Sequence, residues 1–258
     1  MNLGIAGKSV FITGGSKGIG FACAGRFLME GAKVAIASRS QSNLDAALER
    51  LSGAFGVAAD LVEADQATHA IEAAEQAIGP LSILVNSAGA AVRTPPDELT
   101  PAAWRKAFDA KFFSYINVID PVVKRMAARG TGVIINIIGN GGKAPSPTHL
   151  AGGSANAALM LATAGLGAAY APQGVRVVGI NPGLTETDRV TQGLRAEAKL
   201  AQIDEVSMRE VAYKRIPLGR AADPYEIADM ALFLSSERAA YVTAVTITMD
   251  GAQSPSIM

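Results

Sequence analysis

The chain has 258 residues, and its 23 basic side chains are balanced by 23 acidic ones, so the formal net charge is zero. That length fits one large α/β domain or two small ones, and the balanced charge removes any global argument for binding nucleic acid or an acidic surface. Hydrophobic residues make up 49% of the chain against 18% charged, which excludes disorder for most of it because a sizeable core can be buried.

Short apolar runs alternate with helical patterns from one end of the chain to the other. Strands are predicted at residues 9–13, 33–37, 55–58, 82–85, 132–138, 175–180 and 243–249. Helices are predicted at residues 18–30, 43–52, 65–78, 101–129, 152–171 and 224–236. The strands are rich in Val and Ile and mostly do not alternate, which is typical of parallel strands buried on both faces. The pattern predicts an α/β fold, a Rossmann-type doubly wound parallel sheet of about seven strands with helices on both faces.

Two of these helices carry capping residues at their starts. Thr100 stands before Pro101, and Asp223 stands before a proline and three residues ahead of Glu226. A hydroxyl or carboxylate cap, a proline in the first turn and an acid at the third helical position are typical of a helix N-terminus. The two helices are therefore expected to begin at residues 101 and 224.

The chain shows no linker, so residues 1–258 are expected to form one domain with a single insertion. Residues 184–222 contain no predicted strand and are too charged for a core. They follow the carboxyl end of a strand, where ligands bind in open α/β sheets. We expect this segment to be a mobile substrate lid.

Three further features of the sequence concern disulfide bonds, secretion and membrane insertion. Cys23 is the one cysteine, which excludes an internal disulfide framework and a cysteine-rich metal site, and it is expected to be buried in a helix. The N-terminus lacks the basic and apolar regions of a secretory signal, so a cytoplasmic protein is predicted. The stretch between Lys143 and Arg176 has no charge, but prolines and polar residues interrupt it, so a helix buried on more than one side is favoured over a membrane span.

The first strand-to-helix junction, at residues 13–20, reads Thr-Gly-Gly-Ser-Lys-Gly-Ile-Gly. Glycines there let the backbone turn sharply and approach a pyrophosphate, which then lies at the helix N-terminus. A tight turn that binds nothing would look similar, and the spacing differs from the common G-x-G-x-x-G. The position between the first strand and the first helix favours the nucleotide site.

This junction resembles the cofactor loop of the short-chain dehydrogenase/reductase family. Further segments resemble that family in the same order: Asn-Ser-Ala-Gly at 86–89, Asn-Pro-Gly-Leu-Thr-Glu-Thr at 181–187, Pro-Leu-Gly-Arg at 217–220, and Asp-Gly at 250–251. The resemblance covers nearly the whole chain. It implies a dinucleotide-binding oxidoreductase that acts on a small-molecule carbonyl or alcohol, with no nucleic-acid or membrane partner.

The resemblance also implies a set of cofactor-binding residues. They follow the ends of successive predicted strands: Gly14, Ser16, Lys17, Gly18, Ile19, Gly20, Ser38, Arg39, Asp60, Leu61, Asn86, Ala88, Gly89, Asn156, Pro182, Gly183, Thr185 and Thr187.

The end of the second predicted strand bears on which dinucleotide binds. NAD sites usually place an acid there for the ribose 2′-hydroxyl, whereas this chain has Ser38 followed by Arg39, with Lys17 in the glycine loop. Two cations and no anion suit a 2′-phosphate, so NADP is predicted and NAD is less favoured. The alternative is that both cations are ordinary solvated side chains. Asp60 is expected either beside the adenine or as an exposed helix cap.

The catalytic positions are where the resemblance fails. Members of the family use a Ser, a Tyr and, four residues later, a Lys, with an Asn on the preceding helix, but no Tyr-x-x-x-Lys occurs in this chain. Aligning the segments places Gly139 at the Ser, Gly152 at the Tyr, Asn156 at the Lys and Lys111 at the Asn. All four chemical positions differ, while the cofactor positions are kept.

Three side chains are candidates for a replacement. His149 lies three residues before Gly152, on the same face of a helix that starts there, and a histidine is a competent acid/base near neutral pH. Lys111 offers positive charge or a proton, and Asn156 keeps hydrogen-bonding capacity toward a ribose. The alternatives are a polar loop histidine and a solvated or interfacial lysine. No metal site is predicted.

The sequence therefore leaves three functional hypotheses. The first is an NADP-dependent oxidoreductase with a rearranged or degenerate acid/base. The second is an NADP-binding protein without hydride chemistry, serving as a sensor or a structural subunit. The third is a lyase or dehalogenase, ranked last because dehalogenase relatives lose the glycine loop that this chain keeps. A homo-oligomer, either a tetramer or a dimer, is predicted because zero net charge leaves self-association unopposed and residues 157–169 form an uncharged run of small side chains.

Overall fold

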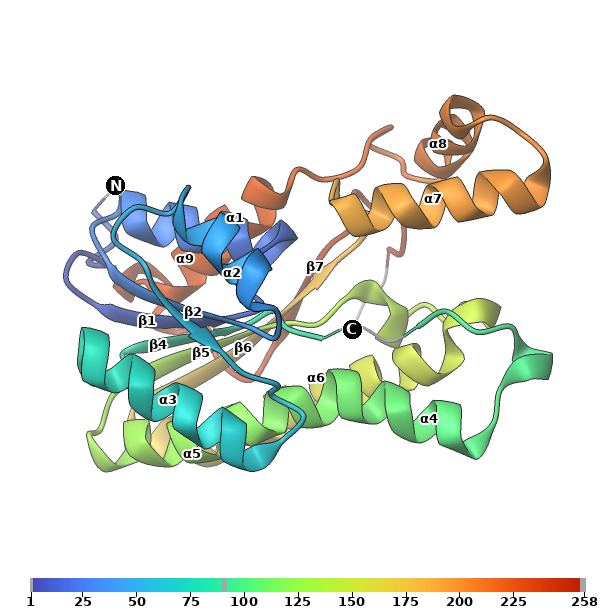
Figure 1. Cartoon of the computed structure of the whole chain (residues 1–258). Coiled ribbons are helices and arrows are strands. Elements are labelled where there is room, and N and C mark those ends of the chain that lie inside the picture. The colour runs from blue at the N-terminus through green and yellow to red at the C-terminus, as the bar shows by residue number, and fades with distance from the viewer. Residues whose placement is uncertain (1, 90–91, 256–258) are drawn as a thin grey trace.

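A computed structural model describes residues 2–89 and 92–255. Its centre is a seven-stranded sheet in the order β3-β2-β1-β4-β5-β6-β7, with every neighbouring pair parallel (Figure 1). The strands are β1 Ser9–Thr13, β2 Lys33–Ser38, β3 Phe55–Ala58, β4 Ile83–Asn86, β5 Gly132–Ile137, β6 Val175–Pro182 and β7 Thr246–Met249. The predicted fold class is confirmed.

Helices cover both faces of the sheet. Their bounds are α1 Gly18–Met29, α2 Gln41–Leu48, α3 Ala64–Ile78, α4 Pro101–Phe108, α5 Ser114–Ala128, α6 Leu150–Tyr170, α7 Asp188–Ala201, α8 Glu205–Lys214 and α9 Pro224–Ser235. Helices α1, α2 and α9 pack on one face and α3, α5 and α6 on the other, while α7 and α8 project from one end (Figure 1).

The strands are apolar without alternation because each face supplies its own core. In β1, Val10 and Ile12 are fully buried under α1 and α9, whereas Phe11 is fully buried under α3 and α5. Cys23 is buried in the first of these cores, as expected, and burial raises the pKa of its thiol to about 12. Both faces of the sheet are thus closed to solvent at its centre, which leaves its carboxyl edge as the place for a site.

The long helix predicted at residues 101–129 is interrupted. Helix α4 ends at Phe108, one π-helical turn covers Asp109–Phe113, and α5 begins at Ser114. Such turns add a residue to the helix and are frequent at functional sites. Here the turn carries Lys111, so it sets the direction of a predicted site residue.

Both predicted helix caps are confirmed. The Thr100 hydroxyl accepts from the backbone N–H of Ala103 at 3.2 Å, and Asp223 and Glu226 form a capping box. Strand β7, by contrast, begins at Thr246 and not at residue 243. Ala244 has a left-handed φ of +60°, which breaks the extended backbone that the apolar pattern suggested.

The inserted segment at residues 184–222 forms α7 and α8, and its two ends pair with each other. Thr185 forms an isolated parallel bridge with Ala222, and backbone hydrogen bonds join Glu186 N to Ala222 O and Ala222 N to Leu184 O. The Glu186 carboxylate also accepts from Arg209 at 3.1 Å and from the hydroxyl of Tyr213. The two ends of the segment are therefore fixed together at the carboxyl edge of the sheet.

The uncharged stretch becomes helix α6, which packs against β6 and α4. Its middle leaves Leu161 77% exposed, so within one chain the helix is not covered all round. In the part of the chain that the structure describes, no helix is both long enough and apolar enough to cross a bilayer.

Candidate active site

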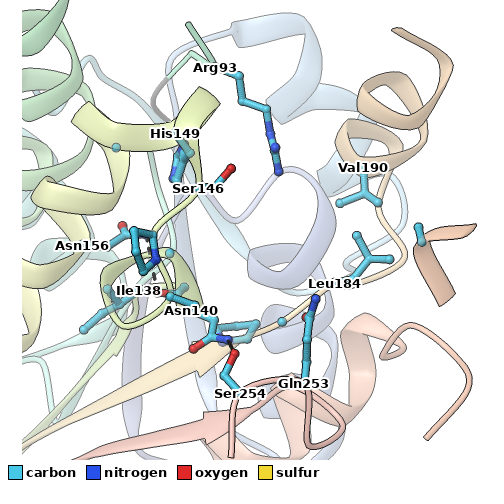
Figure 2. A pocket seen from close by; sticks show the side chains of 18 of the residues that line it. Arg93, Ile138, Asn140, Ser146, His149, Asn156, Leu184, Val190, Gln253 and Ser254 are labelled. Atoms are coloured by element: carbon cyan, nitrogen blue, oxygen red, sulfur yellow. Dashed lines mark hydrogen bonds between the residues drawn. The ribbon is translucent and has the colours of Figure 1, made fainter. Parts of the chain in front are cut away.

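A cavity of about 590 Å³ opens at the carboxyl edge of the sheet, under the inserted segment (Figure 2). Its wall is formed by the residues that follow β4 and β5, the first turns of α6, the end of β6 and one side of α7 and α8. Lys111, His149 and Asn156 all line it, as do Gly139 and Gly152. The cavity thus brings together the residues that the sequence placed at or near the catalytic positions.

Lys111 is the deepest charge of the cavity. Its side chain is 7% exposed, and its ammonium donates to the hydroxyl of Tyr115 at 2.9 Å and to the carbonyl of Ile137 at 3.0 Å. The carbonyl belongs to the last residue of β5 and the hydroxyl to the first turn of α5. The lysine is therefore held in one position by two rigid elements, which rules out the solvated helix lysine considered from the sequence.

Tyr115 is a site residue that the sequence reasoning missed. It is fully buried, its hydroxyl donates to the Ile137 carbonyl, and its ring lies 4.4 Å from the ammonium of Lys111. Burial raises the pKa of this phenol, so it stays neutral and able to donate. The spacing of four residues from Lys111 was the available signal, since such pairs meet on one helix face.

His149 and Asn156 reach the cavity from the start of α6. His149 is the residue before the first helical position, and both side chains lie on the same wall in Figure 2. Gly141 passes close to both: a Cβ there would lie 2.9 Å from His149 Cδ2 and 3.5 Å from Asn156 Nδ2. The Asn156 amide donates a long hydrogen bond, 3.5 Å, to the carbonyl of Gly139. The glycine loop after β5 therefore sets how near the imidazole and the amide come to the cavity.

The two other positions that the sequence aligned with the family's Ser and Tyr are glycines. Gly139, after β5, has φ of +120°, and Gly152 is buried in the first turn of α6. A serine at the first position would be strained, and neither glycine can hold or move a proton.

The glycine junction before α1 is shaped to take a phosphate. A Cβ on Gly14 would lie 2.8 Å from Ala88 Cα, and one on Gly20 would overlap the carbonyl oxygen of Gly14. Lys17, the residue before the helix, gives no side-chain cap to the first turn. The first backbone N–H groups of a helix without such a cap, at its positive dipole end, suit an anionic group.

The residues predicted around the nucleotide ribose lie together. The Ser16 hydroxyl donates to that of Ser38 at 3.0 Å, which joins the glycine loop to the end of β2. Lys17 and Arg39 are both exposed on these two segments. Asp60 accepts from the backbone N–H of Val62 at 3.2 Å, so part of its carboxylate serves a local turn.

Several other predicted cofactor residues use their side chains inside the fold. Asn86 is fully buried and donates to Asn136 at 3.0 Å, which in turn donates to Thr163. This chain of amides fixes the ends of β4 and β5, so any contact of Asn86 with a ligand falls to its backbone. Leu61 is buried, and Thr185 donates to the Gly183 carbonyl at 3.2 Å.

Thr187 connects the inserted segment to the glycine loop. Its Cγ2 would lie 3.2 Å from a Cβ on Gly18, so the segment after β6 packs against the start of α1. Ile19, Ala88, Gly89 and Pro182 complete the predicted set on the same edge of the sheet. In the described ranges, no group of three or more His, Cys, Asp or Glu side chains is arranged to hold a metal ion.

Comparison with known proteins shows which family the chain belongs to. A curated relative, the 2-(S)-hydroxypropyl-CoM dehydrogenase 3 of Xanthobacter autotrophicus, is 35% identical over 247 residues, covering 94% of each chain. The L-sorbose reductase of Gluconobacter frateurii, solved with NADPH and L-sorbose, superposes with a TM-score of 0.93 at 29% identity and covers 100% of both chains.

A second solved structure is an NADPH-bound short chain oxidoreductase from Pseudomonas aeruginosa, described as containing an atypical catalytic center. It is 33% identical, has a TM-score of 0.87, and the match covers 98% of this chain and 99% of that one. The family model for short chain dehydrogenases matches residues 8–198. This chain therefore belongs to the short chain dehydrogenase family.

Proposed function

We propose that the protein is an NADPH-dependent oxidoreductase that transfers hydride between the cofactor and a small carbonyl or alcohol, with a rearranged proton donor. One observation supports this function most directly: the charged and polar side chains of Lys111, His149 and Asn156 line one cavity at the carboxyl edge of the sheet. A protein that only bound the dinucleotide would have no need for a buried, doubly hydrogen-bonded ammonium there.

The residues at the glycine junction fit the cofactor. The N-terminus of α1, with Gly14 to Gly20, would hold the diphosphate, while Lys17 and Arg39 would take the 2′-phosphate. The NADPH complexes of L-sorbose reductase and of the P. aeruginosa oxidoreductase support this choice. When bound, NADPH supplies the hydride.

Arg39→Asp is expected to weaken NADPH binding by about 1.5–3 kcal/mol, the contribution of a charge-assisted hydrogen bond, with little effect on NADH. Lys33→Asp is the matched control, because Lys33 is an exposed cation at the far end of the same strand. Calorimetric titration of both cofactors checks this. Equal affinity of the unchanged protein for NADPH and NADH would contradict the assignment.

The proposed proton chemistry uses the side chains that are present. A hydride delivered to a carbonyl leaves negative charge on its oxygen, and an imidazolium at His149 donates a proton to that oxygen. The ammonium of Lys111 stabilises the same charge from the floor of the cavity, and the amide of Asn156 donates a hydrogen bond to the bound ligands. The similar P. aeruginosa structure, described as containing an atypical catalytic center, supports a rearranged donor in this chain.

The test of this function is NADPH oxidation over a broad panel of carbonyl compounds, with NADPH binding measured separately. Oxidation by any member of the panel supports the proposal. Tight NADPH binding with no oxidation by any of them favours the second hypothesis, an NADP-binding protein without hydride chemistry.

We also propose that residues 184–222 close over the substrate as a lid. Leu184, Val190 and Leu194 of this segment line the cavity, and Thr187 lies against the glycine loop. Apolar lid residues at this position exclude water from the reaction.

A single domain over residues 1–258 and a cytoplasmic location stay predictions from the sequence.

A homo-oligomer, a tetramer or a dimer, is the expected assembly. Leu161 lies 77% exposed in the middle of the uncharged helix α6, which suits burial against a second copy. Light scattering at micromolar concentration should give a multiple of the chain mass, and Leu161→Glu should reduce it. Met29→Glu is the control, since Met29 is equally exposed on α1. A monomeric mass for the unchanged protein would rule the assembly out.

A further inference from the structure

The charged side chains that the structure describes around the cavity are all basic. Arg93, Lys111 and Arg215 line it, and no acidic side chain is among its lining residues within the described chain. Basic and acidic residues are equal in number over the whole sequence, so this imbalance is local. A concave site lined by one sign of charge concentrates ligands of the opposite sign.

The two arginines reach the cavity from different segments of the chain. Arg93 follows β4, and Figure 2 shows its side chain extending between His149 and Val190. Its segment is joined to the loop before α6, because Thr94 N donates to Thr148 O at 2.9 Å and Arg93 Nη1 lies 3.5 Å from Thr148 Oγ1. Arg215 directly follows α8, on the lid side.

These arginines are separate from the proposed cofactor phosphate sites. The glycine junction at residues 14–20 and Arg39 contribute nothing to the lining of this cavity in the structure as described. The residues proposed to bind the dinucleotide phosphates therefore lie outside this cavity. Arg93 and Arg215 instead share the cavity with His149, the proposed proton donor.

We propose that the substrate carries an anionic group, a carboxylate or a phosphate, which Arg93 and Arg215 bind while the reacting carbonyl faces His149. This rests on the proposed function, since the same cavity must take the carbonyl. A guanidinium presents a planar fork of donors that matches the oxygens of either anion, and it stays charged at every working pH. Binding between a fixed wall and the lid would also couple lid closure to the presence of the anion.

The test uses protein saturated with NADP⁺, so that the cofactor phosphates already occupy their own sites and no hydride is present to reduce the carbonyl probes. Two matched pairs of probes are titrated by calorimetry: 3-oxobutanoate against its methyl ester, and dihydroxyacetone phosphate against dihydroxyacetone. We expect one anion to bind about 10- to 100-fold more tightly than its neutral partner, the factor for a charge-assisted hydrogen bond. Which pair shows the difference identifies the anion as carboxylate or phosphate.

Variants assign the effect to the arginines. Arg93→Gln and Arg215→Gln should each weaken the anion about 10-fold or more and leave the neutral probe and NADPH unchanged. Lys214→Gln is the matched control, because it removes one charge from the adjacent exposed residue that is outside the cavity lining. Where an anion is turned over, KM should rise with kcat nearly constant.

Three results would overturn the anionic substrate. They are equal binding of anionic and neutral probes, binding of neither anion by NADP⁺-loaded protein, and equal losses in the arginine variants and Lys214→Gln. Each leaves the proposed function standing as long as NADPH binds in a separate titration. Failure of NADPH itself to bind instead removes the proposed function, and this inference with it.

Discussion

Replacing His149 with alanine is expected to lower kcat about 10²- to 10⁴-fold, the contribution of a positioned acid/base. The imidazole lies on the cavity wall beside Asn156, while Gly139 and Gly152 offer no group that can donate a proton. NADPH affinity should stay nearly unchanged, because the cofactor loop lies at α1 and not at α6. Steady-state kinetics with a carbonyl that oxidises NADPH, together with calorimetry of NADPH, measure both quantities.

The pH profile supplies an independent check on the same residue. The protonated imidazole is the donor, so the rate of reduction should be highest at low pH and fall as rising pH removes its proton. The fall should be absent from whatever activity His149→Ala retains. His69, the other histidine, lies exposed on α3, and His69→Ala is the matched control. Full turnover in His149→Ala would remove the residue from the mechanism and direct attention to Lys111 or a bound water.

Most of the fold could be predicted because hydrophobic pattern alone determines it. Strands β1 and β3 begin and end where the sequence predicts, since each short apolar run is bounded by the glycines and polar residues of its turns. The predicted starts of β7 and α2 were less accurate, because local backbone conformation and capping determine them. Ala244 with its positive φ shortens β7, and the Ser40 hydroxyl, by accepting from Asn43 N, begins α2 two residues early.

The site could be predicted only in outline, because its contacts join residues far apart in the chain. The sequence named Lys111 from its offset to Trp104, but not the π-helical turn that directs it inward or the Ile137 carbonyl that binds it. The arginines of the cavity were missed altogether. Arg93 and Arg215 belong to segments without a motif, and only the folded chain brings them to one space.

Replacing Lys111 with methionine is expected to lower kcat about 10²- to 10³-fold, as for loss of one preorganised donor to a developing oxyanion. Methionine keeps much of the volume of the side chain and removes its charge. The loss should appear also at low pH, where the imidazole is protonated, because the lysine is proposed as a charge and not as the proton donor. That separates its effect from the His149 profile in the same assay.

The same substitution should leave the unfolding temperature unchanged or raise it. Lys111 is 7% exposed, and burying an ammonium costs several kcal/mol of solvation that its hydrogen bonds only partly offset. Tyr115 keeps a hydrogen-bond partner after the change, because its hydroxyl still donates to the Ile137 carbonyl. The substitution therefore leaves neither of these two buried groups without a partner. Lys106→Met, at an exposed position of α4, is the control for adding a methionine. Lower activity with undiminished stability would mark Lys111 as a residue kept for chemistry, whereas a large fall in unfolding temperature with kcat intact would make it structural.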